Sequence, residues 1–249
     1  MSSILDYYNN KKINGFMGAL AENGMIFQSE AQFQHKLAMV IAKDIEKENK
    51  KYEILLESWT DTDENKKDTD KKCYTDIVII DTNSEKKEYI AIELKYKTAE
   101  AEYDTDYGTI HLTPQGANDN GCYDYLLDIQ RIQNQIDKKS EGNLSECKCV
   151  GGYAIILTNE KKYWEYTNEN KKKENGYFQF CIGDNSKIIK NKDLNWKSNR
   201  KEYNNENDAR HTPIKLKYVE NDNFKWLPEK ENNSEFRYLC LEVKPRKDS

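Results

Sequence analysis

The sequence has 249 residues, of which 33% are charged, and its mean hydropathy of -1.02 predicts a very polar surface. Apolar runs are nevertheless spaced along the chain, which excludes a disordered protein, and none approaches the roughly eighteen residues that cross a membrane. Since 39 Lys and Arg stand against 44 Asp and Glu, the formal net charge is -5, which does not by itself indicate nucleic-acid binding. No signal-peptide pattern opens the sequence, so we expect a cytoplasmic protein.

Helices are predicted near the N-terminus. Residues 3–22 have mixed helical character, which Gly24 ends. Ser29, with Gln32 three residues later, is a capping signature that begins a second helix. Glu30 lies in the first turn of that helix, where an acid can simply favour the helix dipole. The apolar stripe of this helix comprises Phe33, Leu37, Val40, Ile41 and Ile45.

A hairpin is predicted for residues 74–97, after a short strand at 52–59 and a charged surface loop at 60–72. Two β-branched runs within it are joined by a turn-rich segment, which is typical of antiparallel strands. The period of two along the second strand separates apolar from charged side chains. One face carries Ile90, Ile92, Leu94 and Tyr96, and the other carries Glu93, Lys95 and Lys97.

Three charged residues of this hairpin form a candidate site. Asp76 opens the first strand and can approach Glu93 across the hairpin, while Lys95 lies on the same face as Glu93. Two crowded, buried carboxylates repel unless a cation lies between them. Hard oxygen ligands suit Mg²⁺, which takes one or two carboxylates and keeps waters for a phosphate substrate. A lysine there can orient a water molecule or stabilise charge on a phosphate oxygen.

The segment after Lys97 is predicted to be a long loop at residues 98–121, with His111 as an ordinary loop histidine. A helix follows at 122–138, and its polar stripe comprises Asp124, Asp128, Arg131 and Gln135. Asp128 and Arg131 have the spacing of an i to i+3 ion pair. A fully apolar strand is then predicted at 153–157.

Aromatic and β-branched residues beyond position 160 predict further strands. We therefore expect residues 1–160 to form an α/β core with an N-terminal helical segment. Residues 161–249 should add a β-rich C-terminal elaboration, packed on the core as one compact unit. The strands are predicted at 177–182, 214–219 and 236–243, with a shorter segment at 224–227.

Basic residues are concentrated at positions 187–217, where nine Lys or Arg stand against four acids. This window is either a surface that follows phosphates or a solvated loop of a lysine-rich protein. The candidate nucleic-acid contacts are Lys97, Lys197, Arg200, Lys201 and Arg210. The six cysteines include one C-x-C pair, Cys147 and Cys149, for which reduced thiols are favoured over a zinc site.

The spacing of Asp76, sixteen intervening residues and Glu93-x-Lys95 resembles the motif of the PD-(D/E)XK nuclease superfamily. Thr75 stands where that motif often has Pro. The predicted order helix, strand, strand, strand, helix, strand over residues 29–158 also matches the αβββαβ core of the superfamily. The resemblance implies a restriction-endonuclease-like α/β fold, in which helices flank a central mixed sheet.

The resemblance further implies roles for the motif residues. Asp76 and Glu93 would bind Mg²⁺, for which Mn²⁺ can substitute, together with the backbone carbonyl of Leu94. Lys95 would position or activate the attacking water. The protein would then be a metal-dependent nuclease that hydrolyses phosphodiester bonds, with DNA as the expected substrate. A setting in restriction, phage defence or repair, as a homodimer or in a larger defence complex, is implied in the same way.

Supporting residues are also implied by the resemblance. A glutamate of the first helix often reaches the metal through water in this superfamily, which implies a role for Glu30 and, one turn on, for Gln34. The helix after the Glu-x-Lys strand often faces a phosphate, which implies a role for Gln130 or Arg131.

Two alternatives stay open. The first keeps the nuclease-like fold without its chemistry, as a catalytically silent nucleic-acid-binding or scaffold subunit. The second is an unrelated α/β interaction protein, in which Glu93 and Lys95 face solvent on an edge strand and no carboxylate is perturbed.

Overall fold

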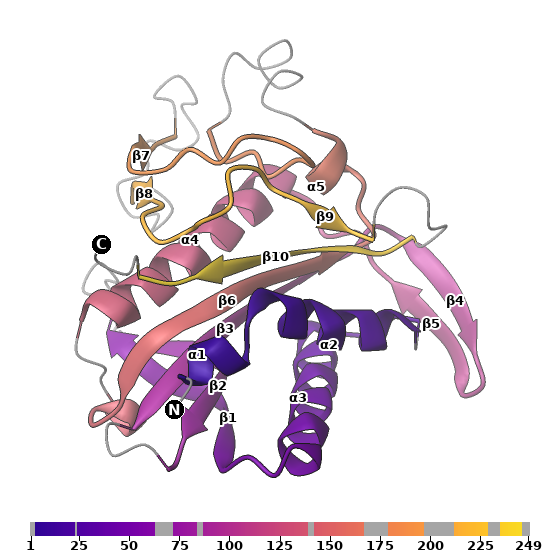
Figure 1. Ribbon diagram of the computed structural model, residues 1–249. Coiled ribbons are helices and arrows are strands. Elements are labelled where there is room, and N and C mark those ends of the chain that lie inside the picture. Colours follow the sequence, from indigo (N-terminus) through magenta and orange to yellow (C-terminus); the bar gives the residue numbers. More distant parts are fainter. Residues whose placement is uncertain are drawn as a thin grey trace.

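One mixed sheet is the central element of the computed structural model (Figure 1). The structure describes residues 3–22, 24–62, 72–83, 87–138, 142–166, 179–196, 212–228 and 235–245. Among the hydrogen-bonded neighbours of the sheet, only β3 and β6 run parallel within these residues. The six strands follow the order β1 (Tyr52–Thr62), β2 (Lys72–Asp81), β3 (Glu88–Lys97), β6 (Lys148–Thr158), β10 (Arg237–Val243) and β9 (Trp226–Leu227).

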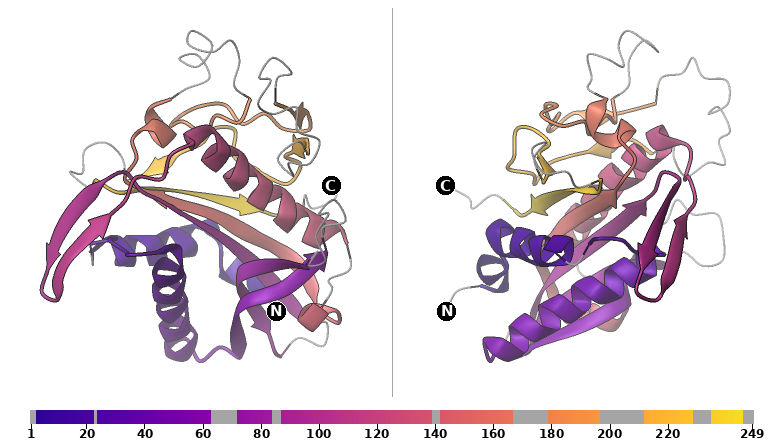
Figure 2. Two further views of the ribbon diagram at one scale, coloured as in Figure 1. Left: turned by 180° about the vertical axis from the view of Figure 1, so that it is seen from behind. Right: turned by 90° about the vertical axis from the view of Figure 1, so that its right-hand side faces the viewer.

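Helices flank the sheet on both sides, so the predicted α/β class with a central mixed sheet is confirmed (Figure 2). One face packs against α1 (Ile4–Tyr7), α2 (Asn10–Glu22) and α3 (Glu30–Lys47). The other packs against α4 (Asn118–Asp137), the short η1 (Gly142–Leu144) and α5 (Lys162–Glu165). The Oγ of Ser29 accepts the N–H of Gln32 at 3.1 Å, which confirms the predicted start of α3.

The predicted hairpin is formed by β2 and β3, and its faces are as expected. Ile90 and Ile92 lie in the core under α1 to α3, together with Leu94 and Tyr96. Because side chains alternate along a strand, Glu93 and Lys95 lie on the α4 side of the sheet. There the neighbouring position Ala91 packs with the α4 core.

The prediction of a loop at residues 98–121 is wrong. The chain forms a second hairpin, β4 (Ala101–Thr105) with β5 (Gly108–Leu112), which projects from the body (Figure 1), and α4 already begins at Asn118. Polar and exposed side chains make up most of both strands, so the segment lacks the apolar alternation by which a strand is recognised. His111 is exposed on β5, where its Nδ1 lies 2.8 Å from Glu102 Oε1.

The C-terminal strands are predicted only in part. The strand expected at 236–243 is β10, which begins one residue later, at Arg237, and pairs with β6 inside the main sheet. Residues 214–219 shorten to β8 (Ile214–Lys215), which pairs with β7 (Asp193–Leu194). The described residues of the segment 177–182 form turn and irregular backbone, and the carbonyl of Ile182 accepts the indole N–H of Trp226 at 2.7 Å.

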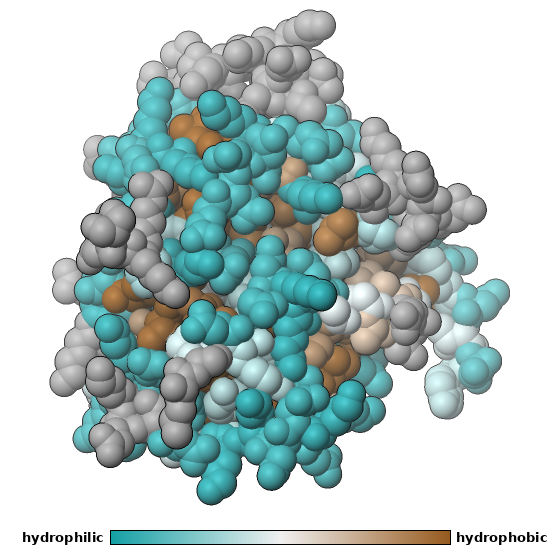
Figure 3. Space-filling model, in the orientation of Figure 1, coloured by the Kyte–Doolittle hydropathy of each residue, from teal (hydrophilic) through white to brown (hydrophobic). Residues whose placement is uncertain are grey.

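The surface is mostly hydrophilic on the face shown in Figure 3, in line with the composition. Among the described residues, no helix is long and apolar enough to cross a membrane. All six cysteines are free thiols, and Cys149 is buried whereas Cys147 is half-buried.

The contact between β3 and β6 gives a stability prediction. A Cβ on Gly152 would lie 2.1 Å from the carbonyl oxygen of Ala91, its partner in β3. Gly152→Ala is therefore expected to lower the free energy of unfolding by about 3 kcal/mol, measured by urea denaturation. Gly18→Ala is the matched control, because a Cβ there meets nothing within 4 Å and a helical Gly→Ala change is neutral or stabilising. Equal stability of the two variants would contradict the prediction.

Candidate active site

The β2–β3 ladder ends at the pair Ile77–Ile92, directly before the predicted site. Beyond it, carboxylates occupy the hydrogen-bonding positions along β3. Asp76 Oδ2 accepts the backbone N–H of Leu94 at 2.6 Å. Glu30 Oε2, from the first turn of α3, accepts the backbone N–H of Tyr96 at 2.7 Å. The opening of the hairpin thus gathers acids from β2 and α3 at one end of β3.

The neighbouring strand is irregular at the same level. Glu57 of β1 has φ +48°, and the β1–β2 pairing skips it. Gln34 of α3 fills the opening, because its Nε2 donates to Glu57 Oε1 at 2.8 Å and to the backbone carbonyl of Asp76 at 2.6 Å. Gln34 therefore fixes the backbone that carries Asp76, and Glu57 adds a carboxylate that the sequence did not reveal.

Lys95 and Asp128 form the other half of the site. Lys95 Nζ lies 2.8 Å from Asp128 Oδ2 and donates to the Leu94 carbonyl at 3.2 Å. Arg131 Nη1 lies 3.0 Å from Asp128 Oδ1, which is the predicted ion pair within α4. Asp128 is 1% exposed and Glu93 is 3% exposed, so both acids lie inside the protein. The structure therefore brings Asp76, Glu93 and Lys95 together with Asp128.

Burial and mutual repulsion perturb these groups. Burial raises the pKa of Asp76 to about 7, although Lys95 and the N–H of Leu94 act against it. Burial, followed by the charges of Asp128 and Asp76, raises the pKa of Glu93 well above its ordinary value. For Lys95, burial alone would lower the pKa, but Asp128, Glu30 and Glu93 outweigh it and raise the pKa. The site therefore keeps Lys95 protonated and disfavours the ionised forms of Asp76 and Glu93.

The donor set fits a hard divalent cation. The Glu93 carboxylate is buried, and burial together with the charges of Asp128 and Asp76 opposes its ionisation more than Lys95 and Arg131 favour it. A buried carboxylate requires a proton or a cation. Asp76, Glu93 and the Leu94 carbonyl offer oxygen atoms only, as Mg²⁺ prefers. No three His, Cys, Asp or Glu side chains of the described segments form a complete metal site, so waters would fill the remaining positions.

Metal-free protein should lose stability as the pH rises from about 5.5 to about 8. Asp76 has a folded-state pKa of about 7, above that of an unfolded chain. Its contribution is therefore complete below about pH 4 and is lost as the pH rises through about 7. Urea unfolding in EDTA should show about 1–2 kcal/mol of this loss from Asp76.

Asp76→Asn is the control for that experiment. The variant keeps a similar shape but cannot ionise, and it also removes the charge that raises the pKa of Glu93, so its pH dependence should be flatter than that of the parent. Parallel curves for the two proteins would contradict a raised pKa at Asp76.

The remaining predicted residues lie in different places. Gln130 Oε1 accepts the backbone N–H of Lys215 at 2.8 Å, so the Gln130 side chain binds β8. Of the two predicted alternatives, Gln130 and Arg131, it is therefore Arg131 that lies beside the site. Lys97 is half-buried at the end of β3. Lys190 and Lys217 of the basic window form ion pairs with acids. The candidates Lys197, Arg200, Lys201 and Arg210 lie outside the described residues.

The alternative of a solvent-facing pair on an edge strand is wrong. In the sheet β3 lies between β2 and β6, and Glu93 is buried with a raised pKa. Sequence reasoning also underrated Asp128, which it placed only in a helix-surface ion pair. Its signal was the apolar stripe a quarter-turn away, which brings that helix face close to the sheet.

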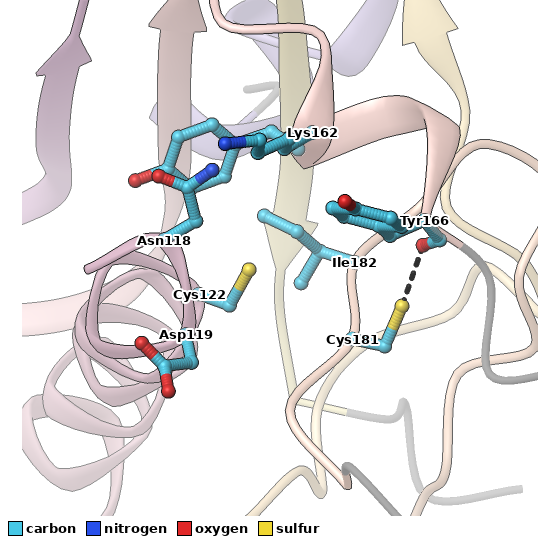
Figure 4. Close-up of a pocket in the computed structure, with 8 residues that line it drawn as sticks. Asn118, Asp119, Cys122, Lys162, Tyr166, Cys181 and Ile182 are labelled. Carbon is cyan, nitrogen blue, oxygen red and sulfur yellow. Dashed lines mark hydrogen bonds between the residues drawn. The ribbon is translucent and has the colours of Figure 1, made fainter. Parts of the chain in front are cut away.

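Hollows also lie elsewhere among the described residues. A groove of about 590 Å³ is lined by Tyr7, Lys50, Lys51 and Tyr52, among others, at the Asp81 end of β2. A second hollow, between α4 and α5, has about 10 Å³ and is barely large enough for one water (Figure 4). Within it, Cys181 donates its thiol to the carbonyl of Tyr166 at 2.7 Å. Neither hollow contains a residue of the predicted site.

Comparisons with known proteins give no match, so any functional assignment rests on the geometry of the site. No protein-family model, no curated protein and no solved structure matches the chain.

Proposed function

We propose that this chain is a Mg²⁺-dependent phosphodiesterase that hydrolyses nucleic acid, with DNA as the expected substrate. The observation that carries the proposal is the buried Glu93 carboxylate, which lies near the acids Asp76 and Asp128 and beside the charged Lys95. Without the second carboxylate or without the lysine, the remaining groups would not combine a pair of Mg²⁺ ligands with a positively charged donor. The elements α3, β1, β2, β3, α4 and β6 follow one another with the β4–β5 hairpin and η1 inserted, and this order supports the proposal, because it resembles the αβββαβ core of PD-(D/E)XK nucleases.

Each residue has a defined part in the proposed reaction. Asp76, Glu93 and the Leu94 carbonyl would hold Mg²⁺, which when bound offsets the acidic charge and polarises the scissile phosphate. Lys95 stays protonated, because the surrounding carboxylates raise its pKa, and it donates a hydrogen bond to the attacking water or to a phosphate oxygen. Gln34 and Glu30 fix β2 and β3 at the site through their hydrogen bonds.

The reaction consumes one water for each bond cleaved. The water oxygen forms a new bond to phosphorus while the bond from phosphorus to one ester oxygen breaks. One proton of the water ends on that leaving oxygen through solvent, and the products are a phosphomonoester and a hydroxyl group. Since Lys95 is already protonated, it orients the water and does not accept this proton.

Cleavage of supercoiled plasmid, labelled single-stranded DNA and RNA tests the proposal directly. We expect cutting with Mg²⁺ or Mn²⁺ and none with EDTA, and the substrate that is cut reports the nucleic-acid class. Calorimetric titration with Mg²⁺ tests the metal site apart from cleavage. Metal binding without cleavage of any substrate would favour a silent nucleic-acid-binding or scaffold subunit, and no metal binding would sink the proposed site.

The setting is proposed on the resemblance alone. Cutting both strands of a duplex, as restriction, phage defence and repair can involve, favours a homodimer. Light scattering with and without a duplex measures whether two copies assemble. A monomer that cuts only single strands would contradict the homodimer.

A further inference from the structure

Asp128 differs from the other acids of α4 in its burial and its partners. Of the Asp, Glu, Lys and Arg residues that the structure describes, none is more buried than Asp128 at 1% exposure. Its neighbours on the inner face of α4 are the fully buried Tyr125, Ile129 and Ile132. A carboxylate among such residues costs several kcal/mol unless cations compensate it.

Both oxygens of Asp128 are engaged by cations from different elements. Lys95 Nζ of β3 lies 2.8 Å from Oδ2, and Arg131 Nη1 of α4 lies 3.0 Å from Oδ1. The ion pair with Arg131 lies within α4. An i to i+3 pair of this kind on a helix surface adds only a little to helix stability. The contact with Lys95 instead joins the helix to the central strand.

The contact restrains a flexible side chain at the site. A lysine ammonium ends a four-carbon stem, so its position is poorly defined unless partners hold it. Lys95 has two such partners, the Asp128 carboxylate of α4 and the Leu94 carbonyl of its own strand. The ammonium is thereby held on the face of β3 that carries Glu93.

We propose that Asp128 is a positioning residue, whose buried carboxylate fixes the Lys95 ammonium at the reaction centre and orients Arg131 beside it. The proposal rests on the proposed nuclease function. Asp128 touches neither substrate nor metal and acts through Lys95. A preorganised donor loses its effect when it is displaced by about 1 Å, which can cost on the order of 10²-fold in rate.

A purely structural role is the competing explanation. Buried ion pairs add little net stability compared with apolar residues of similar volume, whereas removing one partner is strongly destabilising. A structural Asp128 would lower activity through folding, whatever residue stands at position 95. A positioning Asp128 would matter only while Lys95 is present.

A double-mutant cycle on cleavage separates these roles. We expect Asp128→Asn to lower kcat by about 10²-fold with KM changed less than about threefold. In the Lys95→Met background, Asp128→Asn should cause no further loss, because the group through which it acts is gone. Asp137→Asn is the matched control: it is the same substitution on the same helix, in an exposed ion pair with Lys217. Its cleavage should stay within about twofold of the parent.

A second cycle, on urea unfolding of the metal-free proteins, needs no activity. Coupling between Lys95 and Asp128 should reach at least about tenfold in the unfolding equilibrium constant, or about 1.4 kcal/mol. Cleavage losses that are equal in both backgrounds would overturn the positioning role while leaving the nuclease intact. If the parent cuts no substrate, the proposed function fails, and the unfolding cycle alone then decides whether Asp128 fixes Lys95. Absence of coupling there would overturn the proposal by itself.

Discussion

Lys95→Met is expected to lower metal-dependent cleavage by at least about 10²-fold, the typical cost of removing one donor that stabilises developing charge. The substitution keeps most of the stem and removes only the ammonium. Metal binding should persist, because Asp76, Glu93 and the Leu94 carbonyl remain. Plasmid cleavage and Mg²⁺ calorimetry on the same preparations measure the two effects.

The stability of this variant needs its own control. Removing the ammonium leaves Asp128, at 1% exposure, with Arg131 as its remaining ion-pair partner among the described residues. The loss of one buried partner can cost about 3–5 kcal/mol. Lys95→Met combined with Asp128→Asn removes both charges and should be folded, with the same low cleavage as Lys95→Met alone. Lys87→Met, in an exposed ion pair with Glu146, should cut like the parent. Cleavage that survives in Lys95→Met would refute the role of Lys95.

Glu93→Gln is expected to abolish cleavage and to stabilise the metal-free protein. The amide cannot replace a carboxylate as a Mg²⁺ ligand of equal strength, so we expect at least about tenfold weaker Mg²⁺ binding by calorimetry. Without metal, the same change removes a buried charge that Asp128 and Asp76 repel. The free energy of unfolding in EDTA should therefore rise relative to that of the parent.

The opposite signs of these two effects make the test specific. A residue that only supports the fold loses both stability and activity when it is replaced. Glu88→Gln is the control, because Glu88 lies on the same strand and pairs with Lys148 at the other end of β3. Lower stability of Glu93→Gln in EDTA would show that Glu93 is satisfied within the fold, and the metal site would then lose its main support.

The fold was predictable where the apolar residues of a segment follow the pattern typical of a strand or a helix. The apolar stripe of α3 faces one core and has the period of a helix, whereas the β2–β3 hairpin is buried on both faces and was recognised by its β-branched runs and the turn between them. The β4–β5 hairpin escaped prediction because most of its side chains are exposed and polar. The pairing of β10 with β6 could not be derived either, because register between distant strands leaves no local signal.

The site was predictable only along the hairpin. Asp76, Glu93 and Lys95 share a face because of strand geometry, which a sequence reveals. Asp128 reaches Lys95 through the packing of α4 on β3, and this depends on an angle and a translation that no spacing encodes. The strained Glu57, with φ +48°, gives no sequence signal, because its backbone conformation results from the opening of β1 opposite Asp76.

The position of β10 has a consequence for how the chain folds. The strands β1, β2, β3 and β6 are complete by residue 158, but one edge of β6 is paired only when residues 237–243 add to it. Until then that edge offers unpaired N–H and C=O groups beside apolar side chains, which is a template for aggregation. Emerging chains therefore depend on a late, long-range closure, and fragments that end near residue 160 should associate through β6.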